Sequence, residues 1–185
     1  MINPKNVKRF ARKKEEENYA FRAFLKEYAN PKAFDKKVNR LHRELFANYD
    51  CSKCRNCCKG FHGSIPAEDL EKDAKYLKLD VAEFKRKFLE KDDAEGNYIT
   101  RHTPCDFLQL DGSCRLGECR PVACKEYPHT NKPDRIESLI SMLDNAEVCP
   151  VVYEIIERLK QDPDYEAFEE KYVEGFRKMT RLFQK

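Results

Sequence analysis

Residues 51–58 place four cysteines within eight positions, in the order Cys51-Ser52-Lys53-Cys54-Arg55-Asn56-Cys57-Cys58. Intervals of two residues between cysteines let successive sulfur atoms converge on one metal ion or cluster. A buried cysteine can also act as a small hydrophobic residue, but packing gives no reason for four thiols at these intervals. The stretch therefore predicts a metal site at the centre of the folded chain.

The identity of the first ligands depends on the local backbone. If the preceding helix continues through the stretch, a rotation of about 100° per residue places Cys51, Cys54 and Cys58 on one face. If the stretch is a loop, Cys51, Cys54 and Cys57 form the converging set, and Cys58 is a buried thiol or binds something else. Both arrangements supply three thiolates and leave one coordination position open.

A second group of cysteines comprises Cys105, Cys114, Cys119 and Cys124. Asp111-Gly112 lies between alternating apolar residues, a pattern typical of a tight hairpin, which would fold Cys105 and Cys114 toward each other. This group either supplies the ligand missing from the first group or closes a site of its own. Cys149 is a further candidate, because it precedes a predicted helix starting at Pro150 and helix-terminal amides favour thiolate.

Composition indicates a soluble single domain spanning residues 1–185. Hydrophobic residues make up 41% of the chain and charged residues 37%, which suits a buried core beneath a well-solvated surface. The formal net charge is only +3, so nucleic-acid binding is not expected. No apolar run approaches the roughly 18 residues that span a bilayer, and no signal peptide is evident, so we expect no membrane association and a cytoplasmic location.

Cytoplasmic thiols are kept reduced, and the nine cysteines, an odd number, cannot all pair in disulfides. Clustered reduced thiols most often bind metal. Histidine could add nitrogen ligands, but as single residues the four histidines are expected at the surface or in hydrogen bonds; they are His42, His62, His102 and His129.

Three regions differ in cysteine content: a cysteine-free helical flank over 1–50, a cysteine-cluster metal-binding core over 51–150, and a helical flank over 151–185. Helical periodicity dominates, so the predicted fold is mainly α, with one small β-hairpin around the cysteine-rich metal centre. Aromatic residues at helical spacing also predict a helix over 164–183 that packs on the core; they are Tyr165, Phe168, Tyr172, Phe176, Met179 and Phe183.

Capping signals mark the other predicted elements. Asn30-Pro31 starts a helix expected to run into the first cysteines, and Asp80 starts a shorter one that contains Phe84, Phe88 and Leu89. Further helices are expected from Ser64-Ile65-Pro66, over 135–143 and over 150–159. Residues 98–100 are a strand candidate.

The combined motifs resemble the YkgJ-like family of zinc- or iron-chelating CxxCxxCC proteins. The resemblance rests on Cys51-x2-Cys54-x2-Cys57-Cys58, Cys105-Asp106-Phe107-Leu108, Gly112-x-Cys114, Arg120-Pro121-x2-Cys124 and Tyr127-Pro128. It implies metal-binding roles for Cys51, Cys54, Cys57, Cys58, Cys105, Cys114 and Cys124, with Cys149 as a late member. Cys119 has no counterpart in the family pattern.

Family resemblance implies metal chelation but no reaction, so the sequence does not establish an enzyme. Related modules accompany flagellin lysine methylation or are labelled iron–sulfur oxidoreductases. However, the six glycines form no glycine-rich turn of the kind that holds a sulfonium cofactor. The cysteines also lack the three-then-two interval of radical-SAM clusters.

The spacing favours an iron–sulfur cluster slightly over zinc. Zinc sites commonly use two separated Cys-x2-Cys pairs, whereas three cysteines at two-residue intervals are typical of half a ferredoxin motif. The expected role is an accessory or structural metal module with an unknown protein partner. The alternatives are an iron–sulfur redox protein and a subunit of a protein-lysine-methylating enzyme. Arg120 is either a surface arginine or a donor of hydrogen bonds to sulfur or to a neighbouring carboxylate, which would offset thiolate charge.

Overall fold

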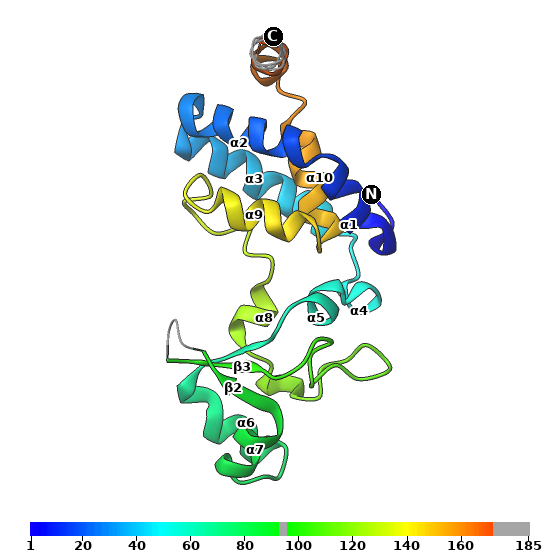
Figure 1. The fold of residues 1–185 in the computed structure, drawn as a ribbon, viewed down its shortest axis with the longest axis vertical. Helices are drawn as coiled ribbons and strands as arrows, with labels where there is room; N and C mark the ends of the chain where they lie inside the picture. Colours follow the sequence, from blue (N-terminus) through cyan, green and yellow to red (C-terminus); the bar gives the residue numbers. More distant parts are fainter. Residues whose placement is uncertain (93–95, 172–185) are drawn as a thin grey trace, which may run out of the picture. The chain divides into compact units, whose positions relative to one another are not determined.

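The computed structural model describes residues 1–92 and 96–171, which form two compact units (Figure 1). The first unit combines both ends of the chain, Met1–Tyr49 and Pro128–Lys185. The second unit is Asp50–Tyr127. Seven of the eight predicted metal-binding cysteines therefore belong to the second unit, and Cys149 belongs to the first.

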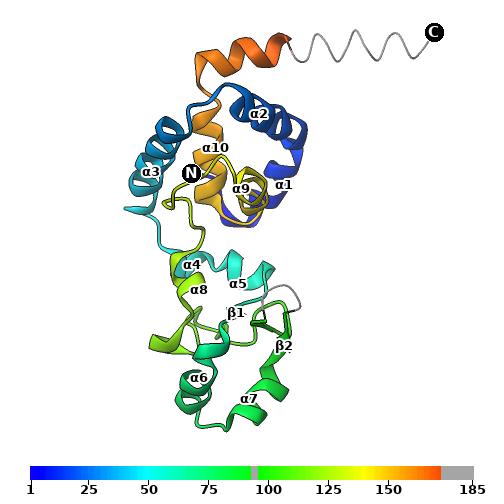
Figure 2. The ribbon, with the colours of Figure 1, turned by 90° about the vertical axis from the view of Figure 1, so that its left-hand side faces the viewer.

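The first unit is a helical bundle in which α10 (Pro150–Leu159) packs against three other helices (Figure 2). These are α1 (Val7–Lys13), α3 (Pro31–Phe46) and α9 (Leu139–Ala146). The helix α2 (Glu15–Tyr28) packs against α1 and α9, and a short 3₁₀ turn, Pro4–Asn6, precedes α1.

Two predicted helix starts are confirmed in this unit. The Asn30 side chain accepts a hydrogen bond from the amide of Ala33 at 3.0 Å, and Pro31 occupies the first turn of α3. Pro150 likewise opens α10, whose buried face consists of Val151, Val152, Ile155, Ile156 and Leu159. Each such aliphatic side chain contributes about 1.5 to 3 kcal/mol when removed from water.

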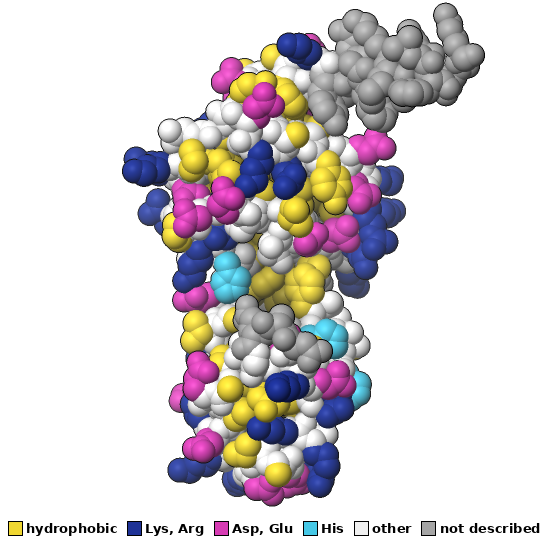
Figure 3. Space-filling model, turned by 60° about the vertical axis from the view of Figure 1, so that its left-hand side comes forward, with side chains coloured by type: hydrophobic (Ala, Val, Ile, Leu, Met, Phe, Trp, Pro, Cys, Tyr) yellow, Lys and Arg dark blue, Asp and Glu magenta, His cyan; other side chains and the backbone are white. Residues whose placement is uncertain are grey.

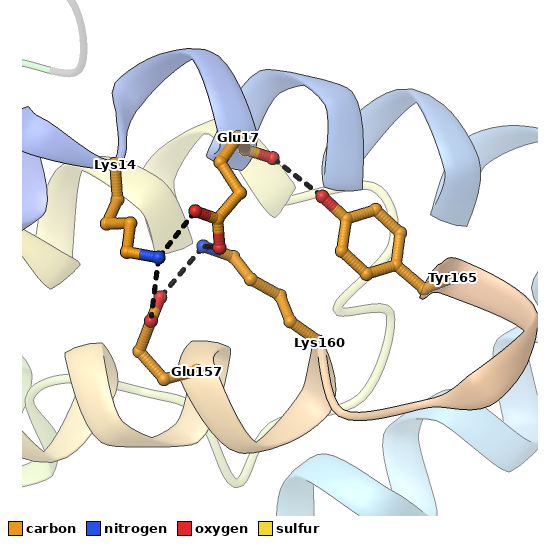
Figure 4. Close-up of polar contacts among 5 residues, drawn as sticks. All are labelled: Lys14, Glu17, Glu157, Lys160 and Tyr165. Carbon is orange, nitrogen blue, oxygen red and sulfur yellow. Dashed lines mark hydrogen bonds and ion pairs between the residues drawn. The ribbon is translucent and has the colours of Figure 1, made fainter. Parts of the chain in front are cut away.

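A network of alternating charges joins the start of α2 to the end of α10 (Figure 4). Lys160, with a side chain only 5% exposed, places Nζ 2.8 Å from carboxylate oxygens of both Glu17 and Glu157. Lys14 Nζ lies 2.6 Å from the other oxygen of Glu17. The nearby Tyr165 hydroxyl donates to the Glu17 carbonyl at 3.1 Å. Each buried charge thus has opposite charges beside it.

Aromatic side chains dock the helix over residues 163–171 onto α2. Tyr165 is buried, and its ring centroid lies 4.8 Å from that of Phe21. Phe168 contacts the rings of Phe24 and Tyr28, with centroids 5.3 and 5.8 Å away. The other members of the predicted aromatic stripe, Tyr172, Phe176, Met179 and Phe183, lie outside the described residues.

The second unit contains short elements around a small antiparallel sheet. The strands are β1 (Ser64–Ile65), β2 (Leu89–Lys91) and β3 (Tyr98–Thr100), in the order β1-β3-β2. Ser64 pairs with Ile99 on one edge, and Glu90 pairs with Ile99 on the other. The strand predicted over 98–100 is confirmed as the central strand.

Helices cover both sides of this sheet (Figures 1 and 2). On one side lie α6 (Leu70–Tyr76) and α7 (Val81–Phe88), and on the other lie α4 (Cys51–Cys54), α5 (Asn56–Gly60) and α8 (Val122–Glu126). The core beneath them consists of Ile65, Leu70, Ala74, Phe84, Leu89, Phe107 and Leu116. Cys105, Cys114 and Cys119 pack against this core, so hydrophobic burial fixes the segments that carry them.

Several predicted boundaries are wrong for local reasons. The predicted helix start at Ser64-Ile65-Pro66 is instead strand β1, and α6 begins only at Leu70 after a 3₁₀ turn, because Ser64 and Ile65 pair with β3. The helix capped by Asp80 ends at Phe88, since Leu89 enters β2.

The helix expected over 135–143 begins at Leu139. Asp134 has a positive φ of 60°, and the amides of Asp134 and Arg135 both donate to the Asp35 carboxylate, at 2.9 Å each. A left-handed residue and side-chain acceptors hold this stretch in turns, so helical hydrogen bonding starts later.

The structure confirms a mainly α fold with a small β part. None of the helices in residues 1–92 and 96–171 is both long and apolar enough to cross a membrane. Basic and acidic side chains are interspersed over the face drawn in Figure 3, in keeping with the small net charge of +3.

Candidate metal centre

Two short helices carry the first four cysteines. α3 ends at Phe46, so the prediction that this helix runs into the cysteines is wrong. Asp50 starts α4 instead, accepting hydrogen bonds from the amide and hydroxyl of Ser52 at 2.9 and 2.5 Å. Arg55 then adopts a left-handed conformation, with φ 53° and ψ 21°, and α5 follows. The stretch is therefore neither one continuous helix nor an open loop.

Backbone contacts bring the first cysteine group to the second. The amide of Cys105 donates to the carbonyl of Cys58 at 2.8 Å. On α5, the sulfur atoms of Cys57 and Cys58 lie 3.9 Å apart. The Cys105 sulfur lies beside Gly63, since a Cβ atom built at this glycine would be in ordinary van der Waals contact with it at 3.5 Å.

The hairpin predicted at Asp111-Gly112 is only a turn with one isolated bridge, since the strands of the sheet lie elsewhere, and this turn lies against α4. A bridge between Leu108 and Cys114 closes it, together with a hydrogen bond from the Gln109 amide to the Ser113 carbonyl at 2.9 Å. Gly112 has a φ of 82°, and a Cβ built there would lie 2.8 Å from the Ser52 carbonyl oxygen. Only glycine combines this backbone conformation with so close an approach.

One cavity of about 30 Å³ collects thiols from both groups. Its walls include Cys58 from α5, Cys105, Cys114 beside the turn, and Cys124 from α8. Arg55, Arg120 and Pro121 line the same cavity. Four thiols from four separate segments thus share one space with two guanidinium groups.

The other predicted ligands lie elsewhere on the unit or outside it. Cys51 is exposed, Cys54 is buried, and Cys57 is half-buried; none of these lines the cavity. Cys119 is half-buried against the hydrophobic core. Cys149 is buried in the first unit at the start of α10. Within the described ranges, no three Cys, His, Asp or Glu side chains are grouped closely enough to hold a metal ion.

Burial and the two arginines have opposite effects on the thiols. Burial raises the pKa of Cys105, and it raises the pKa of Cys124 to about 11 even though Arg120 lowers it. A hydrogen bond from Cys57 and the charges of Arg120 and Arg55 lower the pKa of Cys58 to about 6, whereas the pKa of Cys57 is raised. The two arginines therefore favour the thiolate form of Cys58, which is the member of this pair that lines the cavity.

Arg120 and the histidines have identifiable hydrogen-bond partners. Arg120 donates through Nη2 to the backbone carbonyl of Cys124 at 2.6 Å, whereas the sequence suggested sulfur or a carboxylate as its acceptor. His62 contacts the carbonyl of Thr100, and His102 contacts the carboxylate of Asp106 at 2.7 Å. His42 contacts the hydroxyl of Thr130 at 2.7 Å. Among the described residues, the cavity walls contain no histidine.

Sequence reasoning missed two residues of the second unit. Arg55 lies inside the cysteine motif, yet its place in the cavity depends on a left-handed backbone that its residue type does not signal. Asp73 on α6 is fully buried, and neither carboxylate oxygen has a hydrogen-bond partner in the described part of the chain. In the sequence, Asp73 lies next to the apolar face formed by Leu70, Ala74 and Leu77, which only weakly indicates that its carboxylate is buried.

Comparison with known proteins identifies the family of the chain. No curated protein and no solved structure matches the chain. The model of the CxxCxxCC family, described as "Putative zinc- or iron-chelating domain", matches residues 50–150, more than half of the 185 residues and all eight predicted ligands. The chain therefore belongs to the CxxCxxCC family of zinc- or iron-chelating domains.

Proposed function

We propose that Asp50–Tyr127 is an accessory metal module in which Cys58, Cys105, Cys114 and Cys124 hold a zinc ion or an iron–sulfur cluster. The observation that carries this proposal is the cavity shared by these four thiols, which come from both halves of the cysteine motif. Four thiolates complete the coordination of a structural zinc ion and equally suit a four-iron cluster. The donor set therefore fits both metals named by the family.

The surroundings of the cavity also fit an anionic thiolate centre. Arg55 and Arg120 supply positive charge at its walls, and the Nε of Arg55 is buried without a hydrogen-bond partner among the described residues. In the described residues these thiols are not grouped closely enough to hold a metal ion, so binding would draw the four sulfur atoms closer together. When bound, the metal would supply a cross-link between α5, the turn at 108–114 and α8.

Metal analysis of the protein purified without oxygen tests this function. We expect either zinc without acid-labile sulfide or iron with a matching amount of sulfide. Substituting Cys58→Ser, Cys105→Ser, Cys114→Ser or Cys124→Ser should each lower the bound metal strongly. Protein that contains neither metal after reconstitution with zinc or with iron and sulfide would refute the proposal.

The remaining cysteines provide both controls and a test of the wider ligand set. Cys119→Ser should leave the metal content unchanged, because Cys119 packs against the core and lies outside the cavity walls. Cys51, Cys54, Cys57 and Cys149 remain proposed donors, and their serine variants show whether a second group of thiols contributes. If the serine variants of Cys51, Cys54, Cys57 and Cys149 lose the metal while Cys58→Ser retains it, the metal is bound by different sulfur atoms from those proposed.

An accessory role is supported by the way the cavity is built. Cys105 and Cys114 pack against the hydrophobic core, so the centre is continuous with the structural interior of the unit. A redox function would instead require iron and a reversible colour change. A coloured protein that a mild reductant bleaches and air restores would favour the redox alternative over the accessory one.

A further inference from the structure

Arg55 occupies a backbone conformation that its residue type disfavours. With φ 53° and ψ 21° it separates α4 from α5, between Cys54 and Asn56. For a residue with a Cβ atom, the left-handed region is disfavoured by steric contact, whereas glycine adopts it without this strain. The backbone conformation therefore does not account for an arginine at this position.

The Arg55 side chain is directed into the wall of the thiol cavity. It lines this cavity with Cys58 and Arg120, and its Nε has no hydrogen-bond partner among the residues described. A Cβ built at Gly112 would lie 3.6 Å from Arg55 Cγ and 3.9 Å from Nε, so the turn covers the guanidinium stem. A buried N–H group of this kind needs an acceptor, and the cavity walls offer four thiol sulfur atoms and the Ser113 hydroxyl, of which only a thiolate also carries the negative charge that a guanidinium group favours.

The positive charge of Arg55 would offset the negative charge of a metal centre in this cavity. Four thiolates around a divalent ion carry about two net negative charges, and such a centre is costly in a half-buried cavity unless cations offset it. Arg120 is held in the cavity wall by its bond to the Cys124 carbonyl at 2.6 Å, and Arg55 is the second cation. Two guanidinium groups balance the expected charge of the centre.

We propose that Arg55 is a positioning residue of the metal centre, which balances its thiolate charge together with Arg120 and donates a hydrogen bond to its sulfur ligands. This inference rests on the proposed metal-binding function. It makes Arg55, the first of the two residues between the second and third cysteines of the motif, a determinant of metal affinity, although it supplies no ligand atom.

Three substitutions separate charge from backbone conformation. Arg55→Gln removes the charge and keeps the strained backbone, Arg55→Gly removes the charge and relieves the strain, and Arg55→Lys keeps both charge and strain. The matched control is Arg86→Gln, which removes an exposed arginine of α7 that lies outside the cavity walls. If Arg55→Gln fails to fold, the glycine variant still tests the charge, because glycine suits this backbone.

The affinity of each full-length variant for Zn²⁺ is measured by competition with a chromophoric chelator, under anaerobic conditions. We expect Arg55→Gln and Arg55→Gly to bind zinc about 10- to 100-fold more weakly than the unsubstituted protein. Arg55→Lys should retain more affinity than Arg55→Gln, and Arg86→Gln should bind as the unsubstituted protein does. A purely conformational role predicts instead that Arg55→Gly binds at least as tightly as the unsubstituted protein.

The inference is overturned if Arg55→Gln and Arg55→Gly both bind zinc like the control, or if Arg55→Lys binds no better than Arg55→Gln. Failure of the unsubstituted protein to bind either zinc or iron with sulfide is a different result, since it refutes the metal-binding function itself. The two failures are therefore distinguishable in the same set of measurements.

Discussion

At the level of single residues, Gly112 controls how closely the turn at 108–114 approaches α4. A Cβ at this position would meet the Ser52 carbonyl oxygen at 2.8 Å, and φ is 82°. We predict that Gly112→Ala destabilises the second unit by about 2 to 4 kcal/mol, because it combines backbone strain with a contact to rigid backbone. Urea unfolding of the metal-loaded protein measures the loss, and zinc affinity should fall with it.

Gly96 offers a matched control for this substitution. It also has a positive φ, of 69°, but no described atom lies within 4 Å of a Cβ built there. Gly96→Ala should therefore lower the free energy of unfolding only through backbone strain, by about 1 kcal/mol, and leave zinc affinity unchanged. Equal losses in the two variants would mean that the contact between Gly112 and Ser52 is unimportant.

Asp73 should make the stability of the second unit depend on pH. Burial raises the pKa of its carboxyl group to about 6 from an ordinary value of 3.8. The folded state consequently binds this proton more tightly than the unfolded state, so stability falls as pH rises between these values and the full penalty applies above them. Asp73→Asn removes this penalty. We expect it to stabilise the protein at pH 8 by about 1 to 3 kcal/mol.

The same substitution should have almost no effect on stability at pH 4. Because metal binding by thiols also depends on pH, the informative quantity is the difference in unfolding free energy between variant and unsubstituted protein at each pH. A constant difference from pH 4 to pH 8 would show that Asp73 does not titrate between its ordinary pKa and about 6.

At the level of elements, capping residues determined which boundaries could be predicted. Asn30 and Asp80 each accept the predicted hydrogen bond from the amide three residues later, and Pro150 opens α10. These signals act within one turn of helix, so they are visible in the sequence. The break at Arg55 and the pairing of Ser64 with Ile99 depend on partners distant in the chain, and local patterns cannot reveal them.

The candidate site was predictable to a similar extent. Cysteine spacing identified the thiols and suggested that the two groups meet, and the Asp111-Gly112 pair identified the turn. The spacing could not show that Cys58 lines the cavity and Cys54 does not. That difference depends on the left-handed backbone at Arg55, which separates the two short helices. Nor could it show that two arginines line the same space, because their convergence arises from tertiary packing.

The charge network between α2 and α10 gives a prediction at this scale. Lys160 is the least exposed member, with a side chain 5% exposed, and it pairs with both Glu17 and Glu157. Lys160→Met should destabilise the first unit by about 3 kcal/mol, because two carboxylates lose the cation between them. Urea unfolding monitored by tyrosine fluorescence measures this loss.

Lys14→Met is the control for the network. Its side chain is 41% exposed, so water can solvate Glu17 when the Lys14 ammonium group is removed. We expect the free energy of unfolding to fall by about 1 kcal/mol or less. If the two variants are equally destabilised, the burial of Lys160 does not determine the strength of the network.

At the level of the whole molecule, the two units differ in how their folds are supported. The first unit contains two long helices, α2 with 14 residues and α3 with 16, and both pack a buried face against the bundle. The second unit has helices of four to eight residues and strands of two or three. Isolated helices shorter than about 12 residues are marginal, so the second unit depends more strongly on cross-links between its elements.

Metal removal should therefore affect the two units unequally. Coordination by thiolates contributes folding free energy on the order of 10 kcal/mol, more than the hydrophobic core of a small unit is expected to supply alone. After treatment with a strong chelator, amide hydrogen exchange should become fast in Asp50–Tyr127, while α3 and α10 of the first unit keep their protection. Fast exchange in both units would mean that the first unit cannot fold without the second. Unchanged protection throughout would instead show that the metal sits on a fold already stable by itself, and the module would then have to be explained by what the metal does for a partner.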